Sequence, residues 1–275
     1  MNWFDYSILH AVNSCANRSW VVDAAIVQIS NVGLLVGGLL MILFWWVWTE
    51  EGKASPKQRE ILLINLFATT FAVVVARVIA AGLPFRERPL HYAPLHFQLP
   101  YTMNPEVLLH WSSFPSDHAV VSFCVAAGLW MVSRRVGAWA IAYAALINLP
   151  RIYLGIHYPT DILAGALLGI AMAELAKVAK LRTLAHTLLD YMEQHPRYLY
   201  SLLFLWTFEI GEMFDSLRQF GVLGVKIVLR YPRGRVEEVV GPILVAGLLG
   251  VLSWLVWSKH HSAIEEEEQI LQPRA

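Results

Sequence analysis

Apolar residues gather along the chain into runs whose lengths approach or reach the thickness of a lipid bilayer. A helix that crosses the hydrocarbon core needs roughly 17–25 predominantly apolar residues, and helices are favoured there because they satisfy their own backbone hydrogen bonds. The pattern predicts an all-α, polytopic integral membrane helix bundle with about five core spans. These spans are Val32 to Trp48, Ile61 to Leu83, Asp117 to Ser133, Val136 to Leu149 and Ile162 to Val178.

The segments on either side of these runs have a different character. Residues 3–28 mix aromatic and aliphatic side chains with Asp5 and Arg18, which favours an N-terminal helix that lies along the membrane interface. The sustained apolar pattern ends near the fifth span. We therefore assign residues 1–178 to a membrane domain and residues 179–275 to a C-terminal helical extension.

The extension divides by pattern into four parts. Residues 180–198 are polar and predict a connector, whereas residues 202–221 repeat polar and apolar groups at helical spacing and predict an amphipathic helix. Residues 242–257 are apolar enough for a short extra span, and the acidic tail after them is expected to be disordered. The polar stripe of the amphipathic helix is expected to face solvent and consists of Glu209, Glu212, Ser216 and Gln219.

Composition supports a membrane location and removes several other classes of protein. Hydrophobic residues make up 57% of the chain and charged residues 15%, whereas soluble domains are about 25% charged. Lys plus Arg and Asp plus Glu both number 21, so no basic excess points to a nucleic acid partner. Two cysteines, Cys15 and Cys124, are too few for a disulfide framework or a thiolate metal site.

Basic residues in short loops indicate the orientation of the spans. They fall in three places that alternate correctly with the spans, and the positive-inside rule puts all three in the cytoplasm. The 84–116 loop and the 150–160 loop then lie on the opposite face, which is periplasmic or extracellular for a bacterial inner (plasma) membrane. The basic groups are Lys53, Lys57 and Arg59, then Arg134 and Arg135, then Lys177, Lys180 and Arg182.

The two outer loops concentrate side chains that bind or transfer phosphate. Arginine forks match phosphoryl oxygens, and histidine attacks phosphorus or moves protons near neutral pH. This density of groups predicts a phosphate site between the loops. The residues are Arg86, Arg88 and the run Phe114-Pro115-Ser116-Asp117-His118 in the first loop, and Arg151, His157 and Asp161 around the second.

The start of the third span is suited to hold an oxyanion. Pro115 and Ser116 are good helix-start residues. The backbone amides of Ser116, Asp117 and His118 are therefore expected to point outward as unpaired donors at the positive end of the helix dipole. A histidine at this place, His118, can protonate a leaving oxygen.

The second loop is suited to nucleophilic attack. A proline and a threonine start the fifth span, which places Asp161 in its first turn and His157 just before it. Asp161 could hold the imidazole through one ring nitrogen and leave the other nitrogen free as the nucleophile. Arg88 and Arg151 would clamp the equatorial phosphoryl oxygens.

Together these residues resemble the three-part signature of the type 2 phosphatidic acid phosphatase superfamily. The resemblance covers roughly residues 20–178 and implies a bundle of about six helices and metal-independent phosphatase chemistry without a cofactor. In that chemistry His157 attacks phosphorus to form a phosphohistidine, Asp161 orients it, and His118 protonates the departing group. Arg88, Ser116 and Arg151 would hold the phosphate. The matching motifs are Arg88-Pro89, Pro115-Ser116-Asp117-His118, and Arg151 with five residues to His157 and three more to Asp161.

Three positions depart from the family pattern. The family usually has a lysine seven residues before the first arginine, and here that position is Ala81, so Arg77 or Arg86 is expected to take its cationic role. Asp117 stands where glycine is usual, and we expect its backbone amide to serve the phosphate while its side chain points away. Pro150 replaces the usual serine before the third-motif arginine.

The Ser-Phe-Pro-Ser-Asp-His form of the second motif resembles the bacterial undecaprenyl-diphosphatase branch. It implies hydrolysis of a polyprenyl (undecaprenyl) diphosphate on the outer face, with the lipid tail among the spans. One alternative is another substrate: phosphatidic acid, phosphatidylglycerophosphate, or transfer of phosphate onto another lipid such as lipid A.

A non-catalytic transporter or scaffold is disfavoured because charges within the spans are scarce. A zinc site is disfavoured because no His-Glu-x-x-His is present and the arginines would repel a cation.

Overall fold

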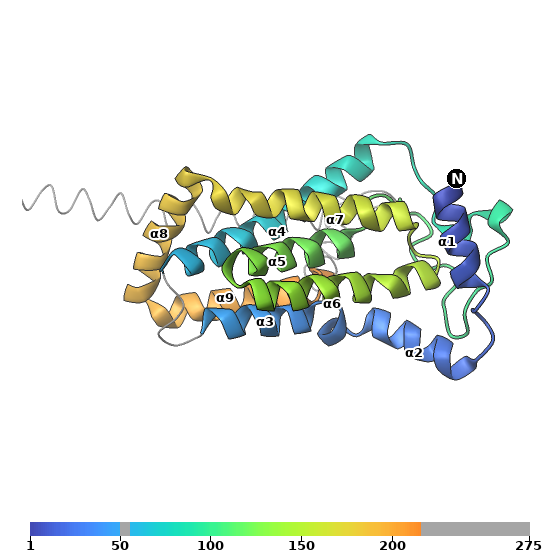
Figure 1. Ribbon diagram of the computed structural model, residues 1–275, viewed down its shortest axis with the longest axis horizontal. Helices are drawn as coiled ribbons and strands as arrows, with labels where there is room; N and C mark the ends of the chain where they lie inside the picture. The colour runs from blue at the N-terminus through green and yellow to red at the C-terminus, as the bar shows by residue number, and fades with distance from the viewer. Residues whose placement is uncertain (50–55, 216–275) are drawn as a thin grey trace, which may run out of the picture.

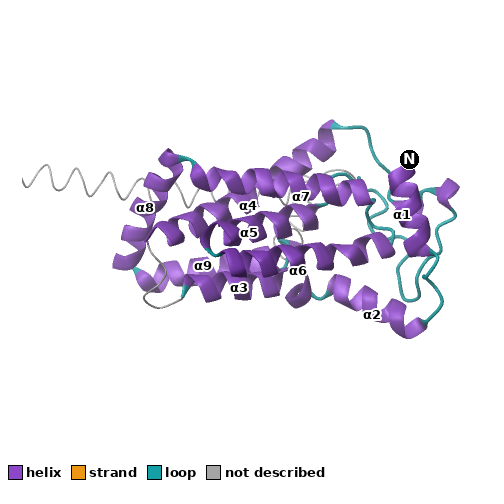
Figure 2. Ribbon diagram, viewed as in Figure 1, coloured by secondary structure: helices purple, strands orange, loops and turns teal. Residues whose placement is uncertain are grey.

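The protein is an all-helical bundle. The computed structural model describes residues 1–49 and 56–215, and every regular element in these ranges is helical (Figure 2). This confirms the predicted all-α class. The helices are α1 (Trp3–Asn13), α2 (Trp20–Asn31), α3 (Leu39–Trp48), α4 (Pro56–Gly82), α5 (Asp117–Val132), α6 (Arg134–Tyr153), α7 (Pro159–Ala173), α8 (Ala179–Gln194) and α9 (Pro196–Gly211). A π-helical turn, Leu34–Gly38, precedes α3, and 3-10 turns lie at Pro89–His91, Ala93–Leu95 and Glu174–Lys177.

Helix α5 lies at the centre of the bundle. It packs against α4, α6 and α7, and α3 and α9 lie along the same long axis (Figure 1). Only Ser133 separates α5 from α6, and its hydroxyl accepts a 3.4 Å hydrogen bond from the Val136 amide in the first turn of α6. The two helices are antiparallel neighbours, as the short turn predicts. The large buried side chains of this core include Phe44, Trp48 and Leu129.

All five predicted spans are helices. By length and composition, Pro56–Gly82 and Pro159–Lys177 are the described helices that could each cross a membrane alone. Trp20–Asn31 and Leu34–Trp48 meet the same criterion only as a pair, and they are bent by 62° at the break between them. Asp117–Val132 is apolar but shorter. The lipid-crossing part of the bundle therefore contains both full-length and short or bent helices.

The bundle has two chemically different ends. The turn before α6 and the start of α4 lie at the end where α8 crosses the bundle (Figure 1). There the Arg182 guanidinium on α8 lies 3.5 Å from the Glu60 carboxylate on α4. The 84–116 loop, the α6–α7 loop and α1 gather at the other end (Figure 1). The basic groups and the candidate phosphate groups are thus separated along the long axis, as the loop charges predict.

The structure differs from the sequence-based prediction at the N-terminus and after α7. Residues 3–28 form two helices, α1 and α2, instead of one. Residues 180–198, predicted as a polar connector, belong largely to α8, which buries Ala185, Leu189 and Met192 on one face. Many residues of α8 are polar, which suggested a connector. Its buried apolar residues nevertheless recur at helical spacing on one face. The predicted extra span, 242–257, and the acidic tail at Glu265 to Glu268 lie outside the described residues.

Helix α9 begins and ends earlier than the predicted range of 202–221. Pro196 starts it and Gly211 ends it, because proline fits the first turn of a helix. Glu209 is only 8% exposed, so the expected solvated stripe is wrong at this position. Glu212 lies past the helix end, with its carboxylate against Gly33. Ser216 and Gln219 lie outside the described residues.

Two glycines let α7 approach α5 closely at the end that carries the candidate site. A Cβ on Gly165 would lie 2.5 Å from the carbonyl oxygen of Ser116, and one on Gly169 would lie 2.3 Å from that of Val120. Both neighbours are backbone atoms, which cannot swing aside as a flexible side chain can. Small residues of this kind set helix spacing in membrane bundles. Gly165 therefore fixes the distance between the starts of the two helices.

We expect Gly165→Ala to lower both stability and phosphatase activity. The added methyl group would push α5 and Ser116 away from α7, and overpacking of this kind costs about 1–3 kcal/mol. Gly82→Ala is the matched control, because a Cβ there meets no atom within 4 Å. The melting temperature in detergent and the specific activity of both variants test this expectation. Equal values for the two variants would contradict the proposed close packing.

Candidate active site

The two loops that carry the predicted site residues meet at one end of the bundle and are joined by backbone hydrogen bonds. The Leu90 amide donates to the Gly155 carbonyl at 3.0 Å, and the Ser116 amide donates to the Asp161 carbonyl at 3.1 Å. The first of these bonds joins the middle of the 84–116 loop to the α6–α7 loop. The second joins the start of α5 to the start of α7. The predicted motifs are therefore brought together by the fold.

Arg88 lies in this junction and is only 4% exposed. Its guanidinium donates to the backbone carbonyls of Trp111 at 3.2 Å, Ser112 at 3.2 Å and Ile156 at 2.7 Å. These acceptors come from both loops, so the arginine plane is fixed between them. Its Nη1 also lies 3.4 Å from Nε2 of His157. A rigid, positively charged fork thus stands beside a histidine nitrogen.

His157 is held so that one ring nitrogen is committed and the other faces Arg88. Its Nδ1 lies 2.8 Å from the carbonyl oxygen of Ser113. A carbonyl only accepts hydrogen bonds, so Nδ1 must carry the proton in this contact. In the neutral imidazole the lone pair is then on Nε2, the nitrogen that faces Arg88. This is the tautomer required for attack by Nε2 on phosphorus.

Burial also favours the neutral form of His157. Desolvation lowers its pKa from 6.5 to about 4; the Asp161 side chain opposes this shift, while the charges of Arg88 and Arg151 add to it. The side chain is 4% exposed, which agrees with a dominant desolvation effect. At neutral pH the imidazole is therefore neutral, with its proton on Nδ1, and Nε2 can act as a nucleophile.

The pKa of His157 predicts an unusual pH profile. A proton on Nε2 blocks attack, so activity should be lost only as the pH falls through about 4, and should not fall near 6.5 because of this residue. The measurement is kcat/KM against pH, with the titration of the phosphate substrate followed separately by phosphorus NMR. An acid limb near 6.5 that the substrate does not explain would contradict the burial argument.

Asp161 is completely buried and makes contacts in two directions. Its Oδ2 accepts a 2.8 Å hydrogen bond from the Tyr158 amide and lies 3.7 Å from Nδ1 of His157. Its Oδ1 pairs with the Arg86 guanidinium. The carboxylate therefore stands beside the imidazole, while the Ser113 carbonyl takes the closer position at Nδ1. The expected Asp161–His157 proximity is present, and Ser113 is an additional partner that the sequence did not suggest.

The start of α5 provides a buried serine and a paired aspartate. Ser116 is fully buried, and its hydroxyl has no hydrogen-bond partner among the residues that the structure describes. Its amide bonds to Asp161, so the expectation of an unpaired amide is wrong at this residue. Asp117 pairs with Arg77 of α4. The Asp117 side chain is thus neutralised by Arg77, one of the two arginines that were expected to take the cationic role missing at Ala81. His118 follows in the first turn and is half-buried.

Arg151 reaches the same region from α6. It is 6% exposed, and its Nη2 donates to the Ser30 carbonyl at the end of α2 at 2.7 Å. Its charge acts on His157, as does that of Arg88. Both arginines therefore lie close enough to His157 for their charges to act on the imidazole. The contact with Ser30 was not predicted, because nothing in the sequence marks a backbone carbonyl so far from Arg151.

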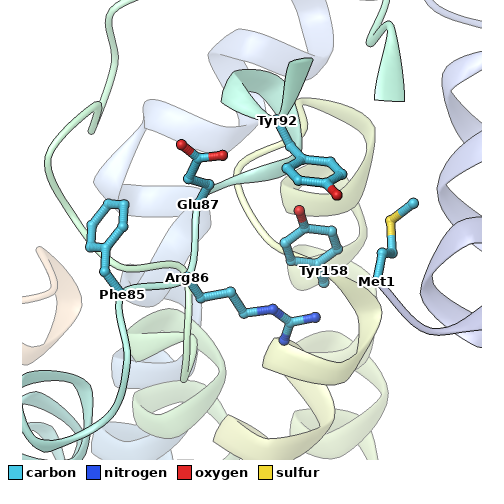
Figure 3. A pocket seen from close by; sticks show the side chains of 6 residues that line it. All are labelled: Met1, Phe85, Arg86, Glu87, Tyr92 and Tyr158. Atoms are coloured by element: carbon cyan, nitrogen blue, oxygen red, sulfur yellow. The ribbon is translucent and has the colours of Figure 1, made fainter. Parts of the chain in front are cut away.

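A pocket of about 430 Å³ opens beside Arg86. Figure 3 shows the Arg86 guanidinium extended beneath the Tyr158 ring, and the hydroxyl ends of Tyr92 and Tyr158 facing one another. The guanidinium carbon lies 4.1 Å from the ring centroid. The other lining residues are Met1, Phe85 and Glu87. Within residues 1–49 and 56–215, no group of three or more His, Cys, Asp or Glu side chains could hold a metal ion.

Several curated proteins are similar in sequence to this chain. Undecaprenyl-diphosphatase BcrC of Bacillus subtilis (strain 168) is 22% identical over 171 residues, which cover 62% of this chain and 81% of that protein. Putative undecaprenyl-diphosphatase YbjG of Escherichia coli (strain K12) is 27% identical over 166 residues, 60% of this chain and 75% of that protein. Lipid A 1-diphosphate synthase of Escherichia coli (strain K12) is 28% identical over 137 residues, 49% of this chain and 56% of that protein.

The family match covers the same part of the chain as the site. Residues 61–183 match the model of the PAP2 superfamily. This range includes α5, α6 and α7 and both loops that form the junction around Arg88 and His157. Residues 61–183 therefore form a PAP2 superfamily domain.

Proposed function

We propose that this protein hydrolyses a polyprenyl diphosphate, undecaprenyl diphosphate, through a phosphohistidine on His157. The observation that carries the proposal is the orientation of this imidazole: Nδ1 is bonded to the Ser113 carbonyl, and Nε2 faces the Arg88 fork at 3.4 Å. A phosphoryl group that binds beside both Nε2 and the arginine would meet a nucleophile and a charged clamp together. The relatives named as undecaprenyl-diphosphatases support the choice of substrate.

The reaction has two steps. In the first, Nε2 of His157 attacks the terminal phosphorus, an N–P bond forms, and the P–O bond to undecaprenyl phosphate breaks as His118 donates a proton to the leaving oxygen. In the second, water attacks phosphorus, its proton passes to His118, and the N–P bond breaks to release inorganic phosphate. The residues assigned to the phosphoryl oxygens are Arg88, Arg151 and Ser116.

The charge that develops on the histidine needs a counter-charge. Phosphorylation of Nε2 while Nδ1 keeps its proton makes the ring cationic. The Asp161 carboxylate, 3.7 Å from Nδ1, lowers the energy of this cation. The Ser113 carbonyl keeps the Nδ1 proton in place. These contacts stabilise the positive charge that the ring acquires on phosphorylation.

The proposed location is the bacterial inner (plasma) membrane, with the site on the periplasmic or extracellular side. The site lies at the end of the bundle opposite to Lys57, Arg134 and Arg182 (Figure 1). Basic residues favour the cytoplasmic side of a membrane. A long isoprenoid tail could remain in lipid beside the helices while only its phosphate groups enter the polar end.

A second substrate class is supported by a specific finding. The relative named Lipid A 1-diphosphate synthase indicates that phosphate transfer onto another lipid uses a similar chain. The same site could therefore act on phosphatidic acid, phosphatidylglycerophosphate or a lipid A phosphate. The nucleophile and the clamp would be unchanged, and only the surroundings of the leaving group would differ.

The test is phosphate release by the purified protein in detergent, with EDTA present, on a panel of these lipid phosphates. We expect the highest kcat/KM on undecaprenyl diphosphate and no loss of rate with EDTA. A higher kcat/KM on a glycerolipid phosphate or on lipid A would change the assigned substrate but leave the proposed reaction through His157 unchanged. Absence of release from every substrate, with His157→Ala behaving identically, would refute the proposed function.

A further inference from the structure

Asp5 of α1 is a buried carboxylate that joins the N-terminal helix to the active-site loops. It is completely buried, and its Oδ1 accepts from the Thr160 amide at 2.9 Å. Its Oδ2 accepts from the Thr160 hydroxyl at 2.7 Å, from Arg86 Nη2 at 2.8 Å and from Asn2 Nδ2 at 3.1 Å. A buried charge is tolerated only when it is paired and hydrogen-bonded in this way. The position of α1 is therefore tied to the first turn of α7.

Arg86 connects this carboxylate to Asp161. Its Nη2 contacts Asp5, and its Nη1 contacts Asp161 and, at 3.0 Å, the Thr160 hydroxyl. The planar guanidinium can hold two carboxylates at fixed positions at the same time. Its face lies on the Tyr158 ring, which limits rotation. With two carboxylates on one guanidinium, the local charge is negative. This arrangement favours a structural role for Arg86 over the phosphate contact expected from its sequence position.

Asp161 passes the constraint on to the nucleophile. One of its oxygens pairs with Arg86, and the other is fixed by the Tyr158 amide and lies 3.7 Å from Nδ1 of His157. Rotation of Arg86 would remove the ion pair that holds Oδ1, so the carboxylate could turn beside the imidazole. A displacement of about 1 Å at a reacting group can lower a rate about a hundredfold. The contacts thus form a continuous path from α1 to the nucleophile.

We propose that Asp5 is a positioning residue of the phosphatase reaction, acting through Arg86 on Asp161 and His157. This inference rests on the proposed function of His157. It makes α1, which lies outside the range that matches the family, part of the working active site. In Asp5→Asn, Arg86 would keep only one carboxylate partner and could turn away from its bridging position. The chemical step should then suffer more than substrate binding.

The experiment is a double-mutant cycle on the full-length protein in detergent, with Asp5→Asn, Arg86→Gln and the combined variant. The assay uses the best substrate of the panel. We expect kcat to fall about ten- to hundredfold in Asp5→Asn, with KM within about twofold. The combined variant should be no slower than Arg86→Gln, because Asp5 acts through that residue. The proposal would be overturned if the losses of kcat in the two single variants multiplied in the combined variant. An unchanged kcat in folded Asp5→Asn would also overturn it.

Asp23→Asn is the matched control. Asp23 is equally buried in the N-terminal region, but its partners are the Tyr153 hydroxyl and the amides of Asn17 and Tyr101. The kcat of Asp23→Asn, measured on folded protein, should stay within about twofold of the wild-type value. A loss equal to that of Asp5→Asn would show a general structural effect and overturn the proposal. An inactive wild type on every substrate would refute the proposed function instead.

A second variant covers the case in which Asp5→Asn does not fold. Arg86→Lys keeps the positive charge but replaces the planar fork with a single ammonium, which cannot hold Asp5 and Asp161 in the same geometry. We expect a similar loss of kcat with little change in KM. Size-exclusion chromatography and thermal unfolding report the folded fraction. A folded Arg86→Lys protein with the kcat of wild type would overturn the proposal.

Discussion

Replacement of His157 by alanine should abolish phosphate release. The variant lacks Nε2, the nitrogen that lies 3.4 Å from Arg88 Nη1 and is assigned the attack on phosphorus. Loss of a covalent nucleophile lowers kcat by three orders of magnitude or more, roughly as in other covalent hydrolases. Initial rates with undecaprenyl diphosphate in detergent measure this effect. Substrate binding should persist, because Arg88 and Arg151 are still present.

His110→Ala is the control for this substitution. His110 belongs to the 84–116 loop and is exposed, whereas His157 is buried. Its activity should remain within about twofold of wild type. Comparable losses in both variants, or a His157→Ala protein that still turns over at a substantial fraction of the wild-type rate, would contradict the assignment of the nucleophile.

Replacement of Arg88 by lysine should lower kcat by about a hundred- to a thousandfold. Loss of one preorganised charged donor to a developing phosphoryl charge has effects of this size. Lysine retains the charge but cannot reach the carbonyls of Trp111, Ser112 and Ile156 together, as the guanidinium does. The buried ammonium would therefore lose its orientation beside Nε2. The kcat and KM of Arg88→Lys, measured separately, show whether the loss lies in the transition state.

Arg134→Lys provides the comparison at the other end of the bundle. Arg134 is the first residue of α6, at the end of the bundle away from the site, and its guanidinium carbon lies 4.8 Å from the centroid of the Trp130 ring. This variant should keep the wild-type kcat. If Arg88→Lys retained more than about a tenth of the wild-type kcat, the clamp role of Arg88 would be wrong.

The core helices and the proximity of the candidate site residues could be predicted from local sequence patterns. Apolar runs predicted the five core helices because burial in lipid imposes a continuous apolar sequence on a helix. The spacing of Arg151, His157 and Asp161 predicted their proximity because a short loop and one helical turn separate them. The structure places Nη1 of Arg88 3.4 Å from His157, as the combined motifs suggested.

The partners that hold these residues could not be predicted in the same way. Ser113 and Ser30 act through backbone carbonyls, which every residue possesses, so no side-chain signal marks them. Asp5 is far from Asp161 in the sequence and meets the site only because α1 folds across the end of the bundle (Figure 1). Its single clue was a carboxylate within an otherwise aromatic N-terminal stretch. Such long-range contacts depend on the tertiary fold.

The neighbourhood of Asp117 shows how packing resolves a conflict in the sequence. A carboxylate near a phosphate is unfavourable, and Ala81 lacks the expected positive charge. In the fold, Arg77 lies one helical turn before Ala81 and pairs with Asp117. The pair neutralises the carboxylate, and Arg77 also donates to the Pro115 carbonyl at 3.3 Å. A substitution at one motif is thus compensated by a residue on another helix.

The central claim is the covalent bond between phosphorus and His157. The most direct measurement uses undecaprenyl diphosphate labelled at its terminal phosphorus, rapid quenching in alkaline denaturant during turnover, and mapping of the labelled peptide. We predict one labelled peptide, which contains His157, and no label in His157→Ala. Label on His118 or another residue, or steady turnover of the wild-type protein without any trapped phosphohistidine, would contradict the account.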